Sequence, residues 1–329
     1  MLAIWLGAVA AVVALVTTRV SPRPAAIVFR QRFDHNGRQR ALATARFVPD
    51  GVVSITDIPY CPGDADALLD VHHPPGPPAA RTTIVWVHGG AWLSGGKDHI
   101  ANYLRVLAAG TGCTVVGVGY SIAPEALYPT PVRQVLDALA YLTAHADELQ
   151  IDPQRLVLAG DSAGAQISAQ VATIVTSPAH AESMDLRPTV DPAQLIGMVL
   201  FCGAFDMTLV NPLRGRNRWF VDSIMWAFTG TNTWLDDDRF AGLSVAHHVT
   251  ADFPPTFLSA GNTDPLLAHS LVMADALTGA GVRCETLFFA DDHVPPIGHQ
   301  YQFLLSTQAA QDAQTAVRAF VESLSPAVV

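Results

Sequence analysis

Apolar runs typical of β-strands alternate with longer helix-like segments along most of this chain. The expected strands cover residues 51–58, 68–72, 82–88, 113–119, 155–159, 195–201, 256–259 and 282–289. The expected helices cover residues 100–109, 131–149, 163–175, 265–280 and about 299–324. Strands that alternate with helices of this length form a mostly parallel sheet, because each helix returns the chain to the same edge. The pattern therefore predicts an α/β fold with helices on both faces of the sheet.

Composition restricts the partners that such a chain could bind. It has 329 residues, half of them apolar, which is enough for one large α/β domain or two average ones. Its 29 acidic residues outnumber its 19 basic residues, and the net charge is −10. Nucleic-acid binding requires a strongly basic surface, so we expect no nucleic-acid partner.

The spacing of cysteines and histidines gives no sign of a metal centre. Cys61, Cys113, Cys202 and Cys284 are far apart in the sequence and form no C-x-x-C pair. The adjacent histidine pairs at 72–73 and 247–248 would point in different directions on either a strand or a helix. We therefore predict no metal ion, and no motif implies a cofactor. The cysteines are interpreted as small buried side chains, with a disulfide left open should the domain be exported.

The first eighteen residues differ from the rest of the chain. Residues 2–16 are an unbroken apolar run, nearly long enough to cross a bilayer. No Lys or Arg precedes the run and no A-x-A site follows it, so we predict an uncleaved membrane anchor at 1–18 rather than a signal peptide or a buried helix. Arginines follow the run, which places the main domain on the cytoplasmic side, with export as the alternative. Residues 19–48 are predicted to form a basic helical arm and residues 49–329 the main domain, whose oligomeric state is left open.

One segment interrupts the alternation of strands and helices. Residues 202–255 separate two expected strands, which is more chain than one crossover helix requires. The segment is rich in large aromatic side chains, at Trp219, Phe220, Trp226, Phe228 and Trp234. We predict a cap insertion at about 203–250 whose aromatic side chains line a pocket. The alternative is that these side chains fill a small core of the insertion's own.

The sequence Gly160-Asp161-Ser162-Ala163-Gly164 joins an expected strand to an expected helix. It matches the G-x-S-x-G pattern in the strand–turn–helix context that this pattern requires. A sharp turn there exposes the serine hydroxyl at the carboxyl edge of the sheet, and it points the first amides of the helix at the same place. Small neighbours are needed because larger side chains would clash in so tight a turn. Ser162 is therefore the candidate nucleophile, and a capping serine in a glycine-rich loop is the alternative.

A serine nucleophile requires a base and an acid that orients the base. In this strand–turn–helix arrangement the acid and then the histidine follow the serine along the chain. Asp264 lies directly after the expected strand 256–259, and a helix cap before Pro265 is its alternative role. Two histidines, His293 and His299, follow the last expected strand. We prefer His299 because it follows a proline- and glycine-rich turn and opens the last expected helix, whereas His293 lies among acidic residues.

A glycine pair follows the third expected strand, in His88-Gly89-Gly90-Ala91. Adjacent glycines let the backbone approach a substrate carbonyl and donate N–H groups to it. The candidate oxyanion-hole donors are the amides of Gly89, Gly90 and Ala91, together with the amide of Ala163. An ordinary glycine-rich turn is the alternative.

These motifs together resemble the hormone-sensitive-lipase-like esterase family of α/β-hydrolases. His88-Gly-Gly-Ala91 is similar to that family's HGGG loop, and Tyr120-Ser-Ile-Ala-Pro-Glu125 is similar to its YRLAPE segment. Gly160-Asp-Ser-Ala-Gly164 matches its serine elbow in every letter. The fold that this resemblance implies is the α/β-hydrolase fold.

Two of the later motifs depart from the family's pattern. Gly261-Asn-Thr-Asp264 resembles the family's acid loop, but Leu267 stands where the family has a further aspartate. His299-Gln-Tyr resembles its H-G-F, with the glycine and the phenylalanine replaced. The likeness covers about residues 50–324.

The resemblance implies a serine carboxylesterase that forms an acyl-enzyme on Ser162, with Asp264 and His299 completing a catalytic triad. It implies small neutral carboxylic esters with short to medium acyl chains as substrates, and no cofactor. The same residues would serve a thioesterase, an amidase, a deacetylase or a lactonase, which the sequence does not separate. A catalytically inactive, membrane-tethered binding module is the alternative of another class.

Overall fold

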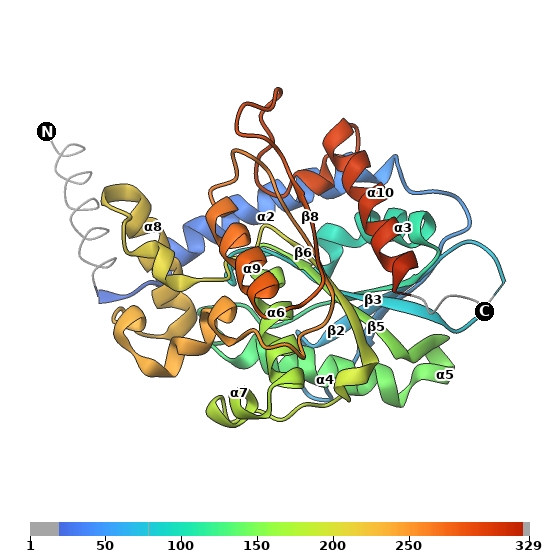
Figure 1. Ribbon diagram of the computed structural model, residues 1–329, viewed down its shortest axis with the longest axis horizontal. Helices are drawn as coiled ribbons and strands as arrows, with labels where there is room; N and C mark the ends of the chain where they lie inside the picture. Colours follow the sequence, from blue (N-terminus) through green and yellow to red (C-terminus); the bar gives the residue numbers. More distant parts are fainter. Residues whose placement is uncertain (1–19, 78, 325–329) are drawn as a thin grey trace, which may run out of the picture.

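The computed structural model describes residues 20–77 and 79–324, which form one eight-stranded sheet flanked by helices (Figure 1). The order across the sheet is β1-β2-β4-β3-β5-β6-β7-β8. β2 is antiparallel to β1 and β4, and all other neighbours are parallel. The predicted mostly parallel α/β sheet is therefore confirmed. The strands are β1 (Val53–Pro59), β2 (Leu68–His73), β3 (Arg81–Val87), β4 (Thr114–Val118), β5 (Ile151–Asp161), β6 (Leu195–Phe201), β7 (Thr256–Ala260) and β8 (Cys284–Phe288).

Helices cover both faces of the sheet because its central strands are apolar on both sides. On β3, Ile84 and Trp86 join a core that also contains side chains of α3 and α10. Val85 and Val87 join a second core on the other face, with side chains of α4, α6 and α9. The described helices are α2 (Arg23–Ala45), α3 (Lys97–Thr111), α4 (Thr130–Ala144), α5 (Ala146–Leu149), α6 (Ala163–Thr176), α7 (Pro178–Ser183), α8 (Gly215–Thr229), α9 (Leu267–Gly279) and α10 (Gln308–Ser323).

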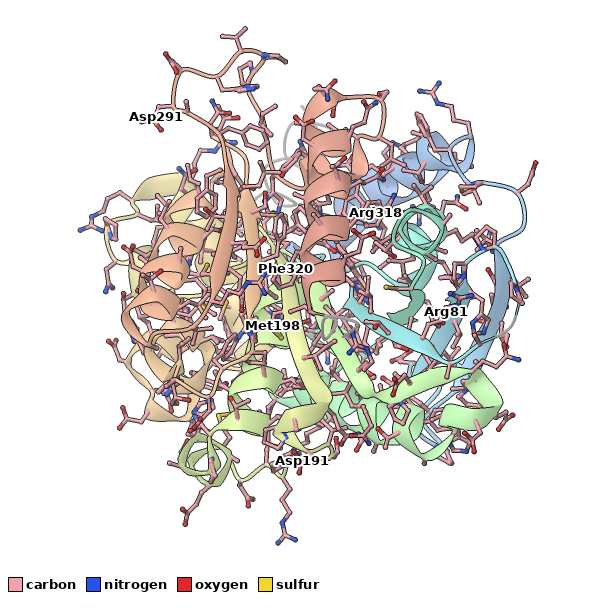
Figure 2. All side chains as sticks on the ribbon, turned by 45° about the vertical axis from the view of Figure 1, so that its right-hand side comes forward. Arg81, Asp191, Met198, Asp291, Arg318 and Phe320 are labelled. Atoms are coloured by element: carbon pink, nitrogen blue, oxygen red, sulfur yellow. The ribbon has the colours of Figure 1, made fainter. Side chains whose placement is uncertain are left out.

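The last helix packs on the sheet through one apolar face. Phe320 of α10 is fully buried, and its ring centroid lies 6.1 Å from that of Phe257 on β7. Arg318, two residues earlier, is exposed and pairs with Glu322 one turn further on (Figure 2). One face of α10 is therefore apolar and buried and the other is polar and exposed, which is the sequence pattern that predicts a helix here.

This helix is nevertheless shorter than the sequence predicts. It begins at Gln308, where the Thr307 hydroxyl accepts a hydrogen bond from the Ala310 amide, rather than near residue 299. Gln300 has a left-handed φ of 58°, a conformation that does not continue a helix. The expectation that His299 opens the last helix is therefore wrong, and His299 lies in a loop before it.

An N-terminal helix, α2, lies outside the sheet and packs on α3 and α8. It covers most of the segment 19–48, which was predicted to form a helical arm. The anchor predicted at residues 1–18 lies outside the described residues. Within the described part of the chain, no helix is both long and apolar enough to cross a bilayer.

The segment between β6 and β7 contains α8 and several short 3₁₀ turns. Phe228 of α8 stacks on Trp92 with 4.9 Å between ring centroids, and Trp234 is buried nearby in the same core. Phe220, near the start of α8, instead contacts Phe29 of α2 and is 36% exposed. Some aromatic side chains of this segment therefore fill a core shared with the main sheet, while others lie at its contact with α2.

All four cysteines are free. Cys113 and Cys202 are buried, as expected of small apolar side chains, whereas Cys61 and Cys284 are partly exposed. Cys202 directly follows β6 and has a left-handed φ of 44°.

The chain passes from β5 into α6 through a very tight turn at Ser162. A Cβ atom at Gly164 would lie 2.1 Å from the carbonyl oxygen of Val87, at the end of β3. A Cβ atom at Gly160 would lie 2.6 Å from the backbone carbonyl carbon of Gly164. No side-chain carbon can approach backbone atoms so closely, so the turn requires glycine at both positions.

We predict that Gly164→Ala destabilises the protein by about 3 kcal/mol or more, because α6 would have to move away from β3. Gly110→Ala is the matched control, because Gly110 lies in α3 with open space around its Cα atom. That control should leave stability unchanged or raise it by up to about 1 kcal/mol. Urea unfolding of both variants measures the two effects, and equal free energies of unfolding would contradict the close-contact argument.

Candidate active site

Ser162 occupies the turn between β5 and α6 in a conformation that serine rarely adopts. Its φ is 54° and its ψ is −121°, and its amide donates a 2.8 Å hydrogen bond to the carbonyl oxygen of Phe201 on β6. The residue is 8% exposed and lines the large cavity described below. Such backbone strain persists only where the surrounding structure enforces it, and it is typical of functional sites.

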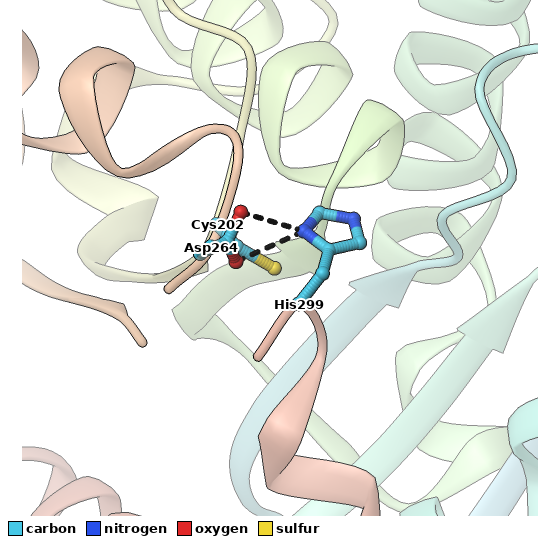
Figure 3. A group of neighbouring side chains, drawn as sticks. All are labelled: Cys202, Asp264 and His299. Carbon is cyan, nitrogen blue, oxygen red and sulfur yellow. Dashed lines mark hydrogen bonds and ion pairs between the residues drawn. The ribbon is translucent and has the colours of Figure 1, made fainter. Parts of the chain in front are cut away.

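His299 bridges Ser162 and Asp264 by hydrogen bonds. Its Nε2 atom lies 3.0 Å from Ser162 Oγ, and its Nδ1 atom lies 2.9 Å from each carboxylate oxygen of Asp264. Figure 3 shows the Asp264 carboxylate facing the imidazole. His293 instead lies by Phe289 and donates from Nδ1 to the Pro295 carbonyl oxygen. The structure thus brings together the serine, the aspartate and the histidine that the sequence favoured, and it does not bring His293 to them.

The loops that carry Asp264 and His299 are joined through Ile297. The amide of Ile297 donates to Asn262 Oδ1 at 2.8 Å, and its carbonyl oxygen accepts from both the amide and the hydroxyl of Thr263. Asp264 Oδ1 also accepts a 2.8 Å hydrogen bond from the Leu266 amide. The local capping role that the sequence left open for Asp264 is therefore compatible with its contact to His299.

Burial alone would lower the pKa of His299, but the hydrogen bond to Asp264 and the charge of that carboxylate raise it well above the ordinary value. Burial raises the pKa of the Cys202 thiol, so this thiol is neutral near pH 7. The Asp264 carboxylate is therefore the charged group that stabilises protonated His299. A raised pKa makes the neutral imidazole a stronger base toward the Ser162 hydroxyl.

Cys202 lies beside Asp264 and His299, and the sequence gave no signal for this contact (Figure 3). Potential ligand atoms of these three residues lie within 4.8 Å of one another, the only such group found among the described residues. A metal ion held there would replace the proton that His299 Nδ1 donates to Asp264. Metal binding and the hydrogen-bonded arrangement are therefore mutually exclusive at this position.

The glycine loop after β3 is held in place by two buried aromatic side chains. The His88 ring donates from Nδ1 to the Gly89 carbonyl oxygen at 2.9 Å, and burial lowers its pKa to about 4, so it is neutral. The Tyr120 hydroxyl donates to the His88 carbonyl oxygen at 2.9 Å, and the two rings stack. Gly90 has a φ of 136°, and a Cβ atom there would lie 2.1 Å from the Ser94 carbonyl oxygen. The loop therefore has little freedom to move.

The four candidate oxyanion-hole residues border the same cavity as Ser162. Gly89, Gly90 and Ala91 line it from the loop after β3, and Ala163 lines it from the first turn of α6. The amide of a first helical residue has no partner within its own helix, which leaves the Ala163 N–H free for a ligand. Ala91 has a left-handed φ of 54°, so the last position of this loop is strained by its Cβ atom.

Helix α2 contributes polar side chains that the sequence did not connect with the site. Arg30 donates to the carbonyl oxygens of Leu93 and Ala123 and pairs with Glu125. Asp34 accepts a hydrogen bond from the Gly95 amide at 3.1 Å. These contacts fasten α2 to both the glycine loop and the Tyr120–Glu125 segment.

A second set of contacts joins α2 to the residues beside Ser162 and His299. Arg40 donates to the side-chain oxygen of Gln300, and the Gln300 amide nitrogen donates to the Asp161 carboxylate. Asp161 is completely buried and also accepts a 2.9 Å hydrogen bond from the Trp86 indole. Gln300 stands at the glycine position of the resembled H-G-F motif, and that replacement was the one sequence signal for this network.

A cavity of about 710 Å³ opens onto Ser162 and His299. Most of its wall is apolar, and the contributing helices include α2 and α8. The apolar wall includes Phe33, Met207, Leu209, Val210, Leu213, Phe220, Val221, Ile224, Met225 and Leu266. Its size and lining suit a small apolar ligand whose polar group lies near Ser162.

A mostly parallel sheet with a strained serine between strand and helix, hydrogen-bonded in turn to a histidine and an aspartate, defines the α/β-hydrolase class. A family model described as the α/β-hydrolase fold matches residues 84–293, most of the chain. The chain therefore belongs to the α/β-hydrolase family.

Individual relatives and solved structures agree with this assignment. Acetyl esterases from Salmonella choleraesuis and Salmonella typhi are each 29% identical to the chain over 216 residues, which is 63% of either sequence. The chain thus spans about 63% of the length of these curated relatives. The comparisons confirm the predicted resemblance to the hormone-sensitive-lipase-like esterases at the level of family.

Two solved structures show the same fold at low sequence identity. Esterase LipW from Mycobacterium marinum has a TM-score of 0.72 and 21% identity, and the match covers 92% of this chain and 90% of that one. Esterase B from Lactobacillus rhamnosis has a TM-score of 0.76 and 20% identity, covering 92% of this chain and 96% of that one.

We predict that Arg40→Ala and Gln300→Ala are coupled by about 1 kcal/mol or more in a double-mutant cycle, because the two side chains share a partly buried hydrogen bond. Arg38→Ala is the matched control, since Arg38 lies on the same helix with its side chain exposed. Its coupling to Gln300→Ala should stay within about 0.5 kcal/mol. Free energies of unfolding in urea give both values, and equal coupling in the two cycles would show that the Arg40–Gln300 contact contributes nothing.

Proposed function

We propose that the protein is a serine carboxylesterase that hydrolyses carboxylic esters through an acyl-enzyme on Ser162. The observation that carries the proposal is the hydrogen-bonded chain from Ser162 Oγ through His299 to Asp264, at the floor of an apolar cavity. Relatives in the family are named acetyl esterase, which supports ester hydrolysis as the reaction.

In the proposed first step, His299 Nε2 accepts the hydroxyl proton while Ser162 Oγ attacks the ester carbonyl carbon. Asp264 holds Nδ1–H toward itself, so that Nε2 is the free base, and its charge stabilises the imidazolium that forms. His299 then donates the proton to the departing alcohol. Water then attacks the acyl-enzyme in the same way, with His299 as the base. The carboxylic acid product leaves, and the Ser162 hydroxyl is restored.

The proposed oxyanion hole consists of the Ala163 amide and amides of Gly89, Gly90 or Ala91. These groups donate to the carbonyl oxygen as it gains negative charge in the tetrahedral intermediate. The contacts of His88 and Tyr120 with the loop support this role, because donors that are already fixed need no rearrangement during the reaction.

We propose small neutral esters with short to medium acyl chains as substrates. A cavity of about 710 Å³ with an apolar wall favours an uncharged substrate of limited length. A thioesterase, amidase, deacetylase or lactonase would use the same groups and is the closest alternative. An inactive binding module is the alternative of another class, and covalent labelling of Ser162 by a fluorophosphonate probe separates it from any active enzyme.

The proposal also assigns roles to two segments outside the triad, residues 203–250 and residues 1–18. Residues 203–250 act as a cap, supported by the side chains of α8 that line the cavity beside those of α2. Residues 1–18 act as a membrane anchor with the catalytic domain on the cytoplasmic side, supported by the apolar sequence and by the arginines that follow it.

Hydrolysis of p-nitrophenyl esters from acetate to palmitate should fall with acyl length, because an apolar cavity of about 710 Å³ limits the chain it can accept. Ser162→Ala should reduce turnover by at least about a thousandfold without unfolding the protein. Ser183→Ala is the control, since Ser183 lies at the end of α7 outside the cavity, and it should retain full activity. Unchanged ester turnover in Ser162→Ala would rule out the proposed nucleophile.

Substitution of each candidate histidine by glutamine, in separate variants, provides a second test. His299→Gln should lower kcat about a thousandfold or more, because glutamine cannot accept the serine proton. His293→Gln should change kcat less than about threefold, since its ring contacts only the Phe289 and Pro295 region. The opposite ranking in steady-state kinetics would mean that the catalytic base is misassigned.

A further inference from the structure

Positive charge is concentrated on two helices of this acidic protein. Residues 23–46, which contain α2, include six arginines and one aspartate, and residues 211–222 at the start of α8 include three arginines and one aspartate. The whole chain carries a net charge of −10. Basic residues are thus segregated from the acidic remainder, which creates a local positive potential.

Several of these arginines are not used in folding contacts. Arg30, Arg40 and Arg218 have side-chain partners in Glu125, Gln300 and Asp222. Arg32, Arg38 and Arg216 are exposed, and none of them pairs with a carboxylate within residues 20–77 and 79–324. These charges therefore remain available to a partner outside the chain.

Exposed apolar side chains accompany the free arginines. Val28, Arg32, His35, Gln39 and Leu42 are all exposed and lie on one side of α2, because their spacing follows the turns of a helix. On this stripe Val28 is 61% exposed and Leu42 is 70% exposed. Exposed apolar side chains at both ends of a polar stripe are unusual on a surface that contacts only water.

The start of α8 packs against α2 and adds further exposed side chains beside that helix. Phe29, next to Val28 on α2, contacts the rings of Trp219 and Phe220 at 5.7 and 4.9 Å between centroids. Trp219 is 49% exposed and follows Arg216 by three residues. The basic face is defined here as Val28, Arg32, Arg38 and Leu42 of α2 with Arg216, Trp219 and Phe220 of α8.

The basic face reaches the rim of the cavity above Ser162. Phe220 belongs to both, because it lines the cavity and is 36% exposed. Phe33 of α2 lines the cavity and contacts Phe220 at 6.4 Å between ring centroids. A partner bound to the basic face would therefore lie next to the cavity.

We propose that the basic face docks on an anionic lipid surface. Arginines provide charge complementarity to acidic headgroups, and Trp219, Phe220, Val28 and Leu42 enter the headgroup boundary. The sequence of residues 1–18, which adjoins α2, is apolar and would bring this face to the same bilayer. Docking delivers apolar esters from the membrane to the cavity rim, and only this delivery step rests on the proposed esterase function.

The same chemistry disfavours a nucleic acid as the partner. Contacts to phosphate and bases require basic and polar groups, and aliphatic side chains such as Val28 and Leu42 gain nothing from them. An interfacial protein segment, in contrast, combines arginines with tryptophan and aliphatic side chains on one surface.

Sedimentation of the full chain with vesicles tests the proposal. Vesicles of equal parts phosphatidylcholine and phosphatidylglycerol should bind the protein more tightly than vesicles of phosphatidylcholine alone, and salt should weaken the difference. The double variant Arg32→Glu with Arg216→Glu should bind the anionic vesicles about tenfold or more weakly. The matched control is Arg133→Glu with Arg187→Glu, which changes the net charge equally at two exposed positions outside the basic face and should change binding less than about twofold.

Quenching by brominated lipid provides the second measurement, because it reports where the face lies even when residues 1–18 also bind the vesicle. Part of the tryptophan quenching should disappear in Trp219→Phe and should weaken in the Arg32→Glu, Arg216→Glu variant. The proposal would be overturned if both charge-reversed proteins bound the vesicles equally and Trp219→Phe left the quenching unchanged. Binding to duplex DNA without binding to anionic vesicles would also overturn it. Neither measurement requires turnover, so a negative result leaves the proposed esterase function untouched.

Discussion

The contact between the first turn of α6 and the end of β3 is the constraint on which the candidate site depends. Gly164 lies so close to the Val87 carbonyl oxygen that a methyl group would not fit between them. This contact forces the strained backbone at Ser162 and brings its hydroxyl, the Ala163 amide and the loop after β3 to one cavity. The positions of Ser162 and the Ala163 amide are therefore fixed by β5 and α6, which are more rigid supports than loops.

Helix α2 is attached to the site by partly buried polar contacts as well as by apolar packing. Arg30 and Asp34 bind backbone groups of Leu93 and Gly95, just after the glycine loop, and Arg40 donates to Gln300 beside His299. Hydrogen bonds that are shielded from water are strong and directional, so they fix the position of a helix more closely than apolar contacts do. The same helix presents exposed arginines on its outer side, which connects the cavity with the proposed lipid-binding face.

Much of the architecture could be predicted because its signals are local. Strands of apolar residues, a glycine-flanked serine at a strand–helix junction and Asp264 directly after a strand all depend on short stretches of sequence. The start of α10 could not be predicted, because residues 299–307 contain no proline or glycine, and Gln300 adopts a left-handed conformation in contact with Arg40 and Asp161. That conformation is stabilised by distant residues, so no local pattern reveals it.

The sequence by itself determined the class of fold, the candidate nucleophile and the order of acid and histidine, since these follow from hydrophobic periodicity and from the chemistry that a serine nucleophile requires. The sequence favoured His299 over His293, but only the tertiary structure brings the His299 ring to Ser162 and directs the His293 ring to Pro295. The tertiary structure also decided that α2 borders the cavity and that Cys202 lies against Asp264 and His299. Contacts between residues far apart in the chain depend on how the helices and loops pack, and packing is not encoded in any single segment.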